Sequence, residues 1–224
     1  MMDYVSQLEL DFKEKANTHI AKKQMAYLKD QFELFGLPTP VRKEVQKPFL
    51  LKENMPSKAE LTKIMKELWD KPQREFQYFA IDLNRKYIKQ LEKQDISLFE
   101  LMIANKSWWD TVDLIATNLV GGYFKAYPEQ IIPITDKWMK SGNMWLQRTC
   151  LIFQLKYKNE IDTNLLKSFI HPLLGSNEFF INKAIGWILR EYTRTNPSWV
   201  IDFVNNTELS NLSKREALKL IKDK

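Results

Sequence analysis

Trp109 and Asp113 are the pair of residues in this sequence whose types and spacing most directly suggest chemistry. Residues four apart share one face of a helix, so in a helix the indole and the carboxylate would point the same way. An indole face attracts cations, and a carboxylate stabilises positive charge. The preceding Trp108 lines up instead with Val112 and Ile115 in an apolar stripe, which predicts a place for Trp108 in the core.

A second tryptophan lies among charges further along the chain. Trp187 is one turn from Lys183, with Arg190 one turn further on. One tryptophan in such surroundings is usually an edge-of-core residue. Two of them, from separate segments and both near charged residues, favour a groove.

Three polar residues recur at a fixed interval: Asp113, Arg148 and Lys183 are 35 residues apart. Each lies two residues beyond the first stripe residue of its helix, about 200° around the axis and so facing away from the core. Stacked helices would align them as a polar ladder on one wall. The alternative is ordinary solvated charge.

The elements that would position these residues are helices almost throughout. The same interval relates apolar stripes with i, i+4, i+7, i+11 spacing at Phe76/Ala80/Leu83/Tyr87, Leu146/Cys150/Phe153/Tyr157 and Ile181/Ile185/Ile188/Tyr192. A fourth copy at Thr111/Ile115/Asn118/Gly122 is weaker and its phase slips. Shorter helices are expected at about 97–104, 128–140, 162–170 and 197–205. This period predicts an all-α fold, an α-solenoid of HEAT-like repeats in one domain over residues 1–224, whose concave side offers a binding surface. A plain helical bundle is the alternative.

Helix starts are marked by several capping patterns. Thr39-Pro40 predicts an N-cap followed by a proline in the first turn. The segments Ser57–Glu60 and Ser213–Glu216 have the capping-box pattern, with a serine three residues before a glutamate.

Composition excludes several classes of site. The chain has 34 Lys+Arg and 28 Asp+Glu, a net charge of +6, which is compatible with nucleic acid without requiring it. A single Cys150 with only His19 and His171 makes a disulfide, a cysteine-ligated cluster or a His/Cys metal site unexpected. Six glycines and no Walker or dinucleotide motif argue against a nucleotide cofactor. From these counts neither a metal nor a cofactor is expected. No signal peptide or membrane-spanning run is recognisable, so a cytoplasmic protein is expected.

Four blocks of the sequence carry a family resemblance. They are "QMAYLKDQFELFGLPTPVRKEV" (Gln24–Val45), "SWWDTVD" (Ser107–Asp113), "WLQRT" (Trp145–Thr149) and "INKAIGWILREYTR" (Ile181–Arg194). In this order and spacing they resemble bacterial DNA alkylation repair enzymes of the AlkD type, over nearly the whole chain. The resemblance implies a HEAT-repeat DNA glycosylase of base excision repair, which removes cationic N3- and N7-alkylpurines from duplex DNA.

The resemblance also implies roles for individual residues. Trp109, Asp113 and Trp187 match the catalytic positions of the family. Arg148 matches a residue that binds the DNA backbone beside the lesion, and Tyr27 matches an aromatic of the same cleft. It further implies that the damaged base can stay in the stack while the protein grips the backbone and sugar, which differs from the usual base flipping.

The chemistry implied is hydrolysis without a general acid. A cationic alkylpurine leaves as a neutral base, so the acid required in ordinary glycoside hydrolysis is unnecessary. No paired-carboxylate motif and no glycosylase/lyase-type lysine is evident, which predicts a monofunctional glycosylase. Asp113 would stabilise the oxocarbenium-like sugar and position water, while Trp109 and Trp187 pack on the sugar and nucleotide and Arg148 holds a phosphate.

Further cations are candidates for phosphate contact. Thr39, Lys43 and Lys47 share a helix face with i, i+4, i+8 spacing, although Thr39 is equally interpretable as an N-cap and the lysines as solvated surface. Lys183 and Arg190 are better candidates because they neighbour Trp187. Such binding would be independent of sequence and sensitive to salt.

The expected partner is therefore double-stranded DNA containing alkylated purines, bound by a monomer that associates with the nucleoid. One alternative is a HEAT-repeat module that binds nucleic acid without catalysis. Another is a protein-interaction scaffold, which would not bind duplex DNA. A helical metabolic enzyme ranks last, since no cofactor or metal signature is present.

Overall fold

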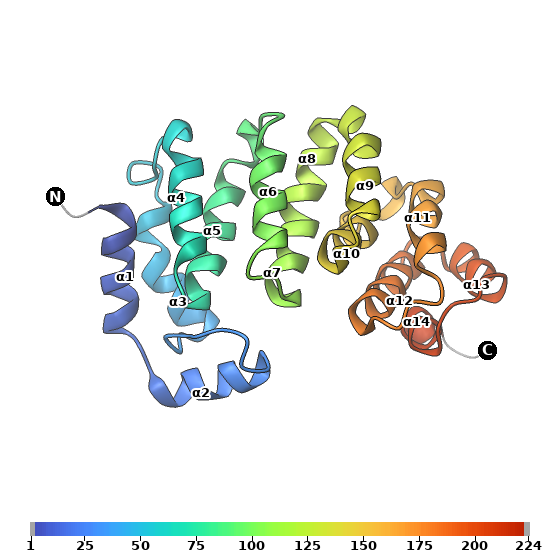
Figure 1. The fold of residues 1–224 in the computed structure, drawn as a ribbon, viewed down its shortest axis with the longest axis horizontal. Coiled ribbons are helices and arrows are strands. Elements are labelled where there is room, and N and C mark those ends of the chain that lie inside the picture. Colours follow the sequence, from blue (N-terminus) through green and yellow to red (C-terminus); the bar gives the residue numbers. More distant parts are fainter. Residues whose placement is uncertain (1–2, 222–224) are drawn as a thin grey trace. The chain divides into compact units, whose positions relative to one another are not determined.

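The fold is known from a computed structural model that describes residues 3–221, where helices are joined by short loops (Figure 1). Extended segments meet in this part of the chain only at an isolated bridge between Glu33 and Gln73. The all-α, helical-repeat class predicted from the sequence is confirmed. The chain separates into two compact units, Met1–Gln90 and Leu91–Lys224. A single domain over residues 1–224 stays a prediction.

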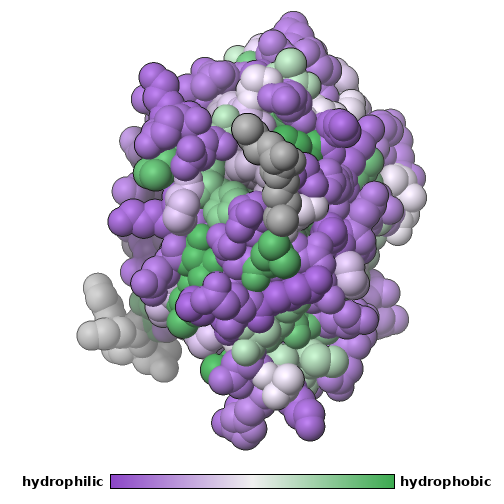
Figure 2. Space-filling model, turned by 90° about the vertical axis from the view of Figure 1, so that its left-hand side faces the viewer, coloured by the Kyte–Doolittle hydropathy of each residue, from purple (hydrophilic) through white to green (hydrophobic). Residues whose placement is uncertain are grey.

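The N-terminal unit is built from five α-helices and two short 3₁₀ turns among its described residues. They are α1 (Tyr4–Glu14), α2 (Thr18–Tyr27), α3 (Thr39–Gln46), η1 (Pro48–Leu50), α4 (Lys58–Asp70), α5 (Arg74–Lys86) and η2 (Ile88–Gln90). Helix α1 packs against α3 and α4, and α4 against α5. The face seen in Figure 2 is largely hydrophilic with small hydrophobic areas between, as is ordinary for a protein surface.

The loop between α2 and α3 is held by a buried carboxylate. Glu75 of α5 accepts hydrogen bonds from the backbone N–H groups of Phe35, Gly36 and Leu37, at 3.1, 3.0 and 3.2 Å. Gly36 has φ +85°, and a Cβ there would lie 2.1 Å from the Asn17 carbonyl oxygen. Only glycine fits this position without strain. The loop therefore places α3, with Lys43 and the C-cap Lys47, in a defined position within this unit.

The C-terminal unit continues the helical pattern. Its described elements are α6 (Asp95–Ala104), α7 (Trp109–Leu114), the π-helical segment η3 (Ile115–Val120), α8 (Gly121–Ala126), η4 (Pro128–Gln130), α9 (Ile131–Lys140), α10 (Met144–Ile152), η5 (Lys158–Glu160), α11 (Thr163–Ile170), η6 (His171–Leu173), α12 (Phe179–Thr193), α13 (Pro197–Asn205), α14 (Asn211–Ala217) and η7 (Leu218–Leu220). Helix α10 lies between α7 and α12, and α12 lies between α10 and α14. None of the helices described in either unit is long and apolar enough to cross a bilayer.

The 35-residue repeat is visible in the helix boundaries. Helices α5, α7, α10 and α12 begin at Arg74, Trp109, Met144 and Phe179, each 35 residues after the last. The apolar stripes of the three strong copies are buried, apart from the half-buried Tyr157. Burial of an i, i+4, i+7 stripe is the driving force for packing successive helices. The predicted repeat is confirmed.

The weak fourth copy has a structural cause. Helices α7 and α8 are continuous through η3, where the backbone widens to a π-helix from Ile115 onward. An extra residue in one turn rotates everything after it around the axis. Thr111 and Ile115 of the expected set are buried, as is Val112, but beyond Ile115 the fully buried residues include Leu119 and Tyr123, whereas Asn118 and Gly122 are only half-buried. The predicted phase slip is confirmed at this place.

Two of the predicted capping patterns have different outcomes. The Ser57 box is confirmed: the Glu60 carboxylate accepts from the Ser57 N–H at 3.0 Å and from its hydroxyl at 2.6 Å. Thr39 as an N-cap is wrong by one position, since Thr39 is the first helical residue and Pro38 is the cap, without a side-chain hydrogen bond. Proline at the second helical position still suits a helix start, because the first-turn N–H groups have no helical partner.

The predicted capping box at Ser213–Glu216 is wrong. Helix α14 begins earlier, at Asn211, and its N-cap is Ser210, whose hydroxyl oxygen accepts from the Ser213 N–H at 3.1 Å. Glu216 is 2 % exposed and faces α12. The local sequence pattern predicted a helix cap, but in the structure Glu216 is buried in the contact between α14 and α12.

Candidate active site

A cleft of about 330 Å³ lies in the C-terminal unit, between three helices that occupy equivalent positions in the repeat. Its lining side chains come from α7, α10 and α12: Trp109, Asp113, Arg148, Phe179, Phe180, Lys183, Trp187 and Arg190. Six of these are residues that the sequence predicted for the site. The structure therefore brings together all three predicted catalytic residues and three of the predicted DNA-binding residues.

The repeat explains why these residues meet. Asp113, Arg148 and Lys183 are each the fifth residue of their helices, which begin 35 residues apart. Equivalent positions on packed neighbouring helices lie next to one another, so residues distant in sequence share one wall of the cleft. Trp109 and Phe179 are likewise each the first residue of a helix.

Asp113 and Arg148 form a two-pronged ion pair. Arg148 Nε donates to Asp113 Oδ1 at 2.7 Å, and Nη2 donates to Oδ2 at 2.9 Å. The side chain of Arg148 is only 3 % exposed and that of Asp113 only 14 %. Planar guanidinium and carboxylate groups match in this geometry, which fixes the orientation of both.

The predicted polar ladder is only partly correct. Arg148 is buried, although it was expected to face away from the core. Its remaining nitrogen, Nη1, donates to the carbonyl oxygen of Phe180, so the ladder does not continue to Lys183. Arg148 and Lys183 are both cations, and each takes a different acidic or carbonyl partner. Burial of Arg148 follows from its place between α7 and α12, where only paired charge is tolerated.

The electrostatics at Asp113 combine two opposing effects. Burial raises the pKa of this carboxyl above its usual value, while hydrogen bonds and the positive charge of Arg148 act in the lowering direction. The balance leaves the pKa raised. Each carboxylate oxygen has a second lone pair beyond the one used by Arg148, so the group can still accept a hydrogen bond from the cleft.

Aromatic rings form the other walls. Trp109 and Trp187 are half-buried, and Phe179 is 56 % exposed. Phe180 also lines the cleft, with its ring centroid 5.2 Å from Trp108 and 5.0 Å from Trp145. These contacts are within the range of favourable aromatic packing.

Trp108 does not occupy the helical stripe predicted for it. It is the N-cap of α7, with extended backbone at φ −156° and ψ 159°, and it is half-buried. Its ring packs on Trp145 and Phe180, whereas the aliphatic stripe begins at Val112. Trp108 therefore does not line the cleft but packs on Phe180, which does.

Lys183 and Arg190 are held by one acidic residue of α14. Glu216 Oε1 lies 2.8 Å from Lys183 Nζ and 2.5 Å from Lys219 Nζ, and Oε2 lies 2.9 Å from Arg190 Nη1. Burial alone would raise the pKa of Glu216, but Lys183 and Lys219 outweigh it and lower the pKa to about 2. The glutamate is thus ionised, and Lys183 and Arg190 are both paired with it.

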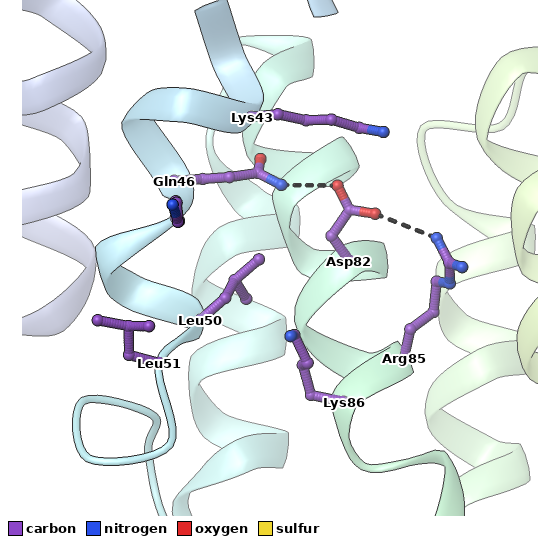
Figure 3. Close-up of a pocket in the computed structure, with 8 residues that line it drawn as sticks. Lys43, Gln46, Leu50, Leu51, Asp82, Arg85 and Lys86 are labelled. Carbon is purple, nitrogen blue, oxygen red and sulfur yellow. Dashed lines mark hydrogen bonds and ion pairs between the residues drawn. The ribbon is translucent and has the colours of Figure 1, made fainter. Parts of the chain in front are cut away.

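The other predicted DNA-binding residues belong to the N-terminal unit. Tyr27 ends α2 and is 69 % exposed, and Thr39 is exposed at the start of α3. Lys43 and Lys47 line a pocket of about 560 Å³, which we call the basic pocket (Figure 3). Its other lining residues are Gln46, Leu50, Leu51, Asp82, Arg85 and Lys86. That Tyr27 shares a cleft with the catalytic residues stays a prediction.

The basic pocket carries an excess of positive charge. Its one lining carboxylate, Asp82, accepts from Gln46 Nε2 at 2.7 Å, and Arg85 lies 3.6 Å away (Figure 3). The buried Arg42 also donates to Asp82, at 3.1 Å. Within residues 3–221, none of Lys43, Lys47 and Lys86 forms an ion pair with a carboxylate. Such a surface suits phosphate groups.

Comparison with known proteins identifies the family. A family model described as DNA alkylation repair enzyme matches residues 8–221. The chain belongs to the DNA alkylation repair enzyme family. The chain is similar to a solved structure from Enterococcus faecalis, which is described as a predicted DNA alkylation repair enzyme. The two share 32 % sequence identity, with a TM-score of 0.87. The match covers 93 % of this chain and 98 % of the other. No curated protein matches the chain.

Two aromatic residues that line the cleft, Phe179 and Phe180, were missed from the sequence, as was Glu216, which lies outside the cleft and pairs with two of its cations. Phe179 could have been found, because it stands at the same repeat position as Trp109, 70 residues on. Glu216 gave no such signal, since its pattern suggested a cap. No group of three or more His, Cys, Asp or Glu residues suited to a metal occurs among residues 3–221.

Proposed function

We propose that this protein is a monofunctional DNA glycosylase that hydrolyses the N-glycosidic bond of cationic N3- and N7-alkylpurines in duplex DNA. The observation that carries the proposal is the Asp113 carboxylate, oriented by Arg148 and opening into a cleft walled by Trp109 and Trp187. Family membership supports alkylated DNA as the substrate. The glycosylase reaction is the inference from the cleft.

The proposed chemistry needs one carboxylate. The bond between C1′ and the purine nitrogen breaks, and its electron pair neutralises the positive charge already on the base. C1′ becomes oxocarbenium-like, Asp113 stabilises this charge, and water adds to C1′ while its proton passes to Asp113 or to solvent. The raised pKa of Asp113 makes the carboxylate a better proton acceptor than an exposed one.

The surrounding groups have supporting roles. The faces of Trp109 and Trp187 attract the cationic sugar and nucleotide, each by ~0.5–2 kcal/mol. Arg148 balances the charge of Asp113, which reduces the repulsion between this carboxylate and DNA phosphates. Lys183 and Arg190 supply positive charge on the α12 side of the cleft. A phosphate contact of Arg148 itself would use the guanidinium N–H groups that Asp113 and Phe180 leave over.

The test is release of free base from DNA containing 7-methylguanine. Wild type should release it, and Asp113→Asn should be slower by roughly 100- to 1000-fold, as for loss of one preorganised group. Affinity for the same duplex should change little. Base release unaffected by Asp113→Asn would refute the catalytic assignment, and absence of duplex binding in a gel shift at moderate salt would instead favour a protein-interaction scaffold.

A further inference from the structure

The wall of the cleft formed by α12 is shaped by its contact with α14. Gly186 lies at the closest approach, where an added Cβ would be 2.4 Å from Glu216 Cβ and 2.9 Å from the Ser213 carbonyl oxygen. The Ser213 hydroxyl donates to the Asn182 carbonyl oxygen at 2.8 Å. Arg190 reaches Glu216 from the same side. Helix α14 therefore docks along the α12 face that carries residues 182, 186 and 190.

Lys183 and Arg190 lie at the edge between two faces of α12. Together with Trp187 they line the cleft, yet both also contact Glu216 on α14. Their side chains are 36 % and 27 % exposed, so neither cation is freely solvated. A long cationic side chain has many rotamers in water, and an ion pair with a buried partner restricts them.

Glu216 has the properties that such an anchor requires. It is 2 % exposed, its carboxylate contacts three cations, and its helix cannot shift toward or away from α12 without disturbing the contact at Gly186. Removing an ion-pair partner from a buried charge is costly, so the arrangement is self-consistent only when all members are present. One anionic residue outside the cleft thus determines where two cations of the cleft are held.

We propose that Glu216 is a positioning residue for the cleft, which holds Lys183 and Arg190 on either side of Trp187 so that they meet the substrate backbone at fixed places. The inference rests on the proposed function and deepens it. Glu216 touches no substrate in this scheme. The negative charge of Glu216 offsets one of the two cations and so weakens the attraction between the cleft and DNA. The same ion pairs fix the positions of the cations, which favours the reaction.

If Glu216 positions the two cations, removing its charge should change affinity and rate in opposite directions, which simple destabilisation would not do. Glu216→Gln keeps the shape of the side chain and removes its charge. Affinity for undamaged duplex should then rise, and the slope of log K against log salt should steepen by up to ~1, because one more uncompensated cation is available to phosphates. The single-turnover rate of base release should fall by roughly tenfold, since misplacement of binding groups by about 1 Å can cost up to 100-fold.

Two further variants complete the experiment. Glu216→Asp keeps the charge but shortens the reach, so the salt slope should stay near wild type while the rate falls. It also decides the matter if Glu216→Gln does not fold. Glu160→Gln is the matched control: Glu160 is 62 % exposed, pairs with Lys125 in the same unit and does not line the cleft. Its rate and affinity should stay near wild type.

The outcomes separate this inference from the proposed function. Loss of both affinity and rate in Glu216→Gln would show an ordinary structural role and overturn the inference, as would an unchanged rate in both Glu216 variants. If wild type releases no base, the proposed function fails. The affinity and salt slope of Glu216→Gln, measured on undamaged duplex, then still decide whether Glu216 restrains the two cations. An unchanged slope would overturn the inference about Glu216.

Discussion

Replacing Arg148 by methionine should destabilise the C-terminal unit, because it leaves the Asp113 carboxylate buried without its partner. The pair is 3 % and 14 % exposed, and Arg148 makes three hydrogen bonds, two to Asp113 and one to Phe180. Breaking a buried ion pair from one side costs ~3–5 kcal/mol. Asp113 retains some contact with solvent and can take up a proton, so we expect the lower end, ~3 kcal/mol at neutral pH.

The loss should depend on pH in a defined direction. In the wild type, burial raises the pKa of Asp113 and Arg148 acts against it. Without Arg148, burial acts unopposed and the folded-state pKa rises further above the unfolded value. A carboxyl with a raised folded pKa favours folding at low pH, and this contribution is lost as the pH rises through the folded pKa. The stability deficit of Arg148→Met should therefore be largest at neutral pH and shrink on acidification.

The assay is urea unfolding followed by tryptophan fluorescence, since six of the seven tryptophans lie in the C-terminal unit. The double variant Asp113→Asn/Arg148→Met removes both charges and should be more stable than additivity of the single changes predicts, by ~2 kcal/mol. Arg194→Met is the control, because it breaks an exposed pair with Glu191 and should change stability by less than ~0.5 kcal/mol. A cost below ~1 kcal/mol for Arg148→Met, with strict additivity in the double variant, would refute the reasoning.

Three further predictions concern the reaction, the α12–α14 contact and the basic pocket. The rate of base release should fall as the pH drops through the raised pKa of Asp113. In a pH–rate profile, Arg148→Met should move this acid limb to higher pH. An acid limb at or below the usual aspartate pKa would contradict the assignment of Asp113. Gly186→Ala gains ~1 kcal/mol of helix propensity but overpacks the contact with Ser213 at a cost of ~1–3 kcal/mol, so urea unfolding should show net destabilisation, and a stabilised variant would mean that the helices separate freely. Lys43→Gln with Lys86→Gln should make the salt slope of duplex binding shallower by up to ~2, with little effect on thermal stability; an unchanged slope would show that the basic pocket does not meet phosphates.

Much of the helical framework could be predicted because it rests on local signals. Starts at Arg74, Trp109, Met144 and Phe179 follow the period of the apolar stripes. Even the phase slip near Ile115 was visible as a displaced stripe, although its cause, a π-helical turn, was not. Periodicity survives because each repeat buries the same face against its neighbours.

The site was predictable to the extent that it follows this repeat. Asp113 and Arg148 stand at equivalent positions, so stacking brought them together as expected. The environment of Arg148 was predicted wrongly, because its burial depends on how closely α10 is enclosed by its neighbours. Residue roles in substrate binding stay predictions for the experiments above.

The sequence by itself determined the helical period, the positions that face one another across the repeat and the family to which they belong. Only the tertiary structure decided which charges pair. Arg148 turned to Asp113 and the Phe180 carbonyl, and Lys183 turned to Glu216, which the local pattern had marked as a helix cap. The reason is physical: helix propensity and apolar period act between near neighbours, whereas a buried charge takes whichever partner the packing of distant helices brings within hydrogen-bonding range.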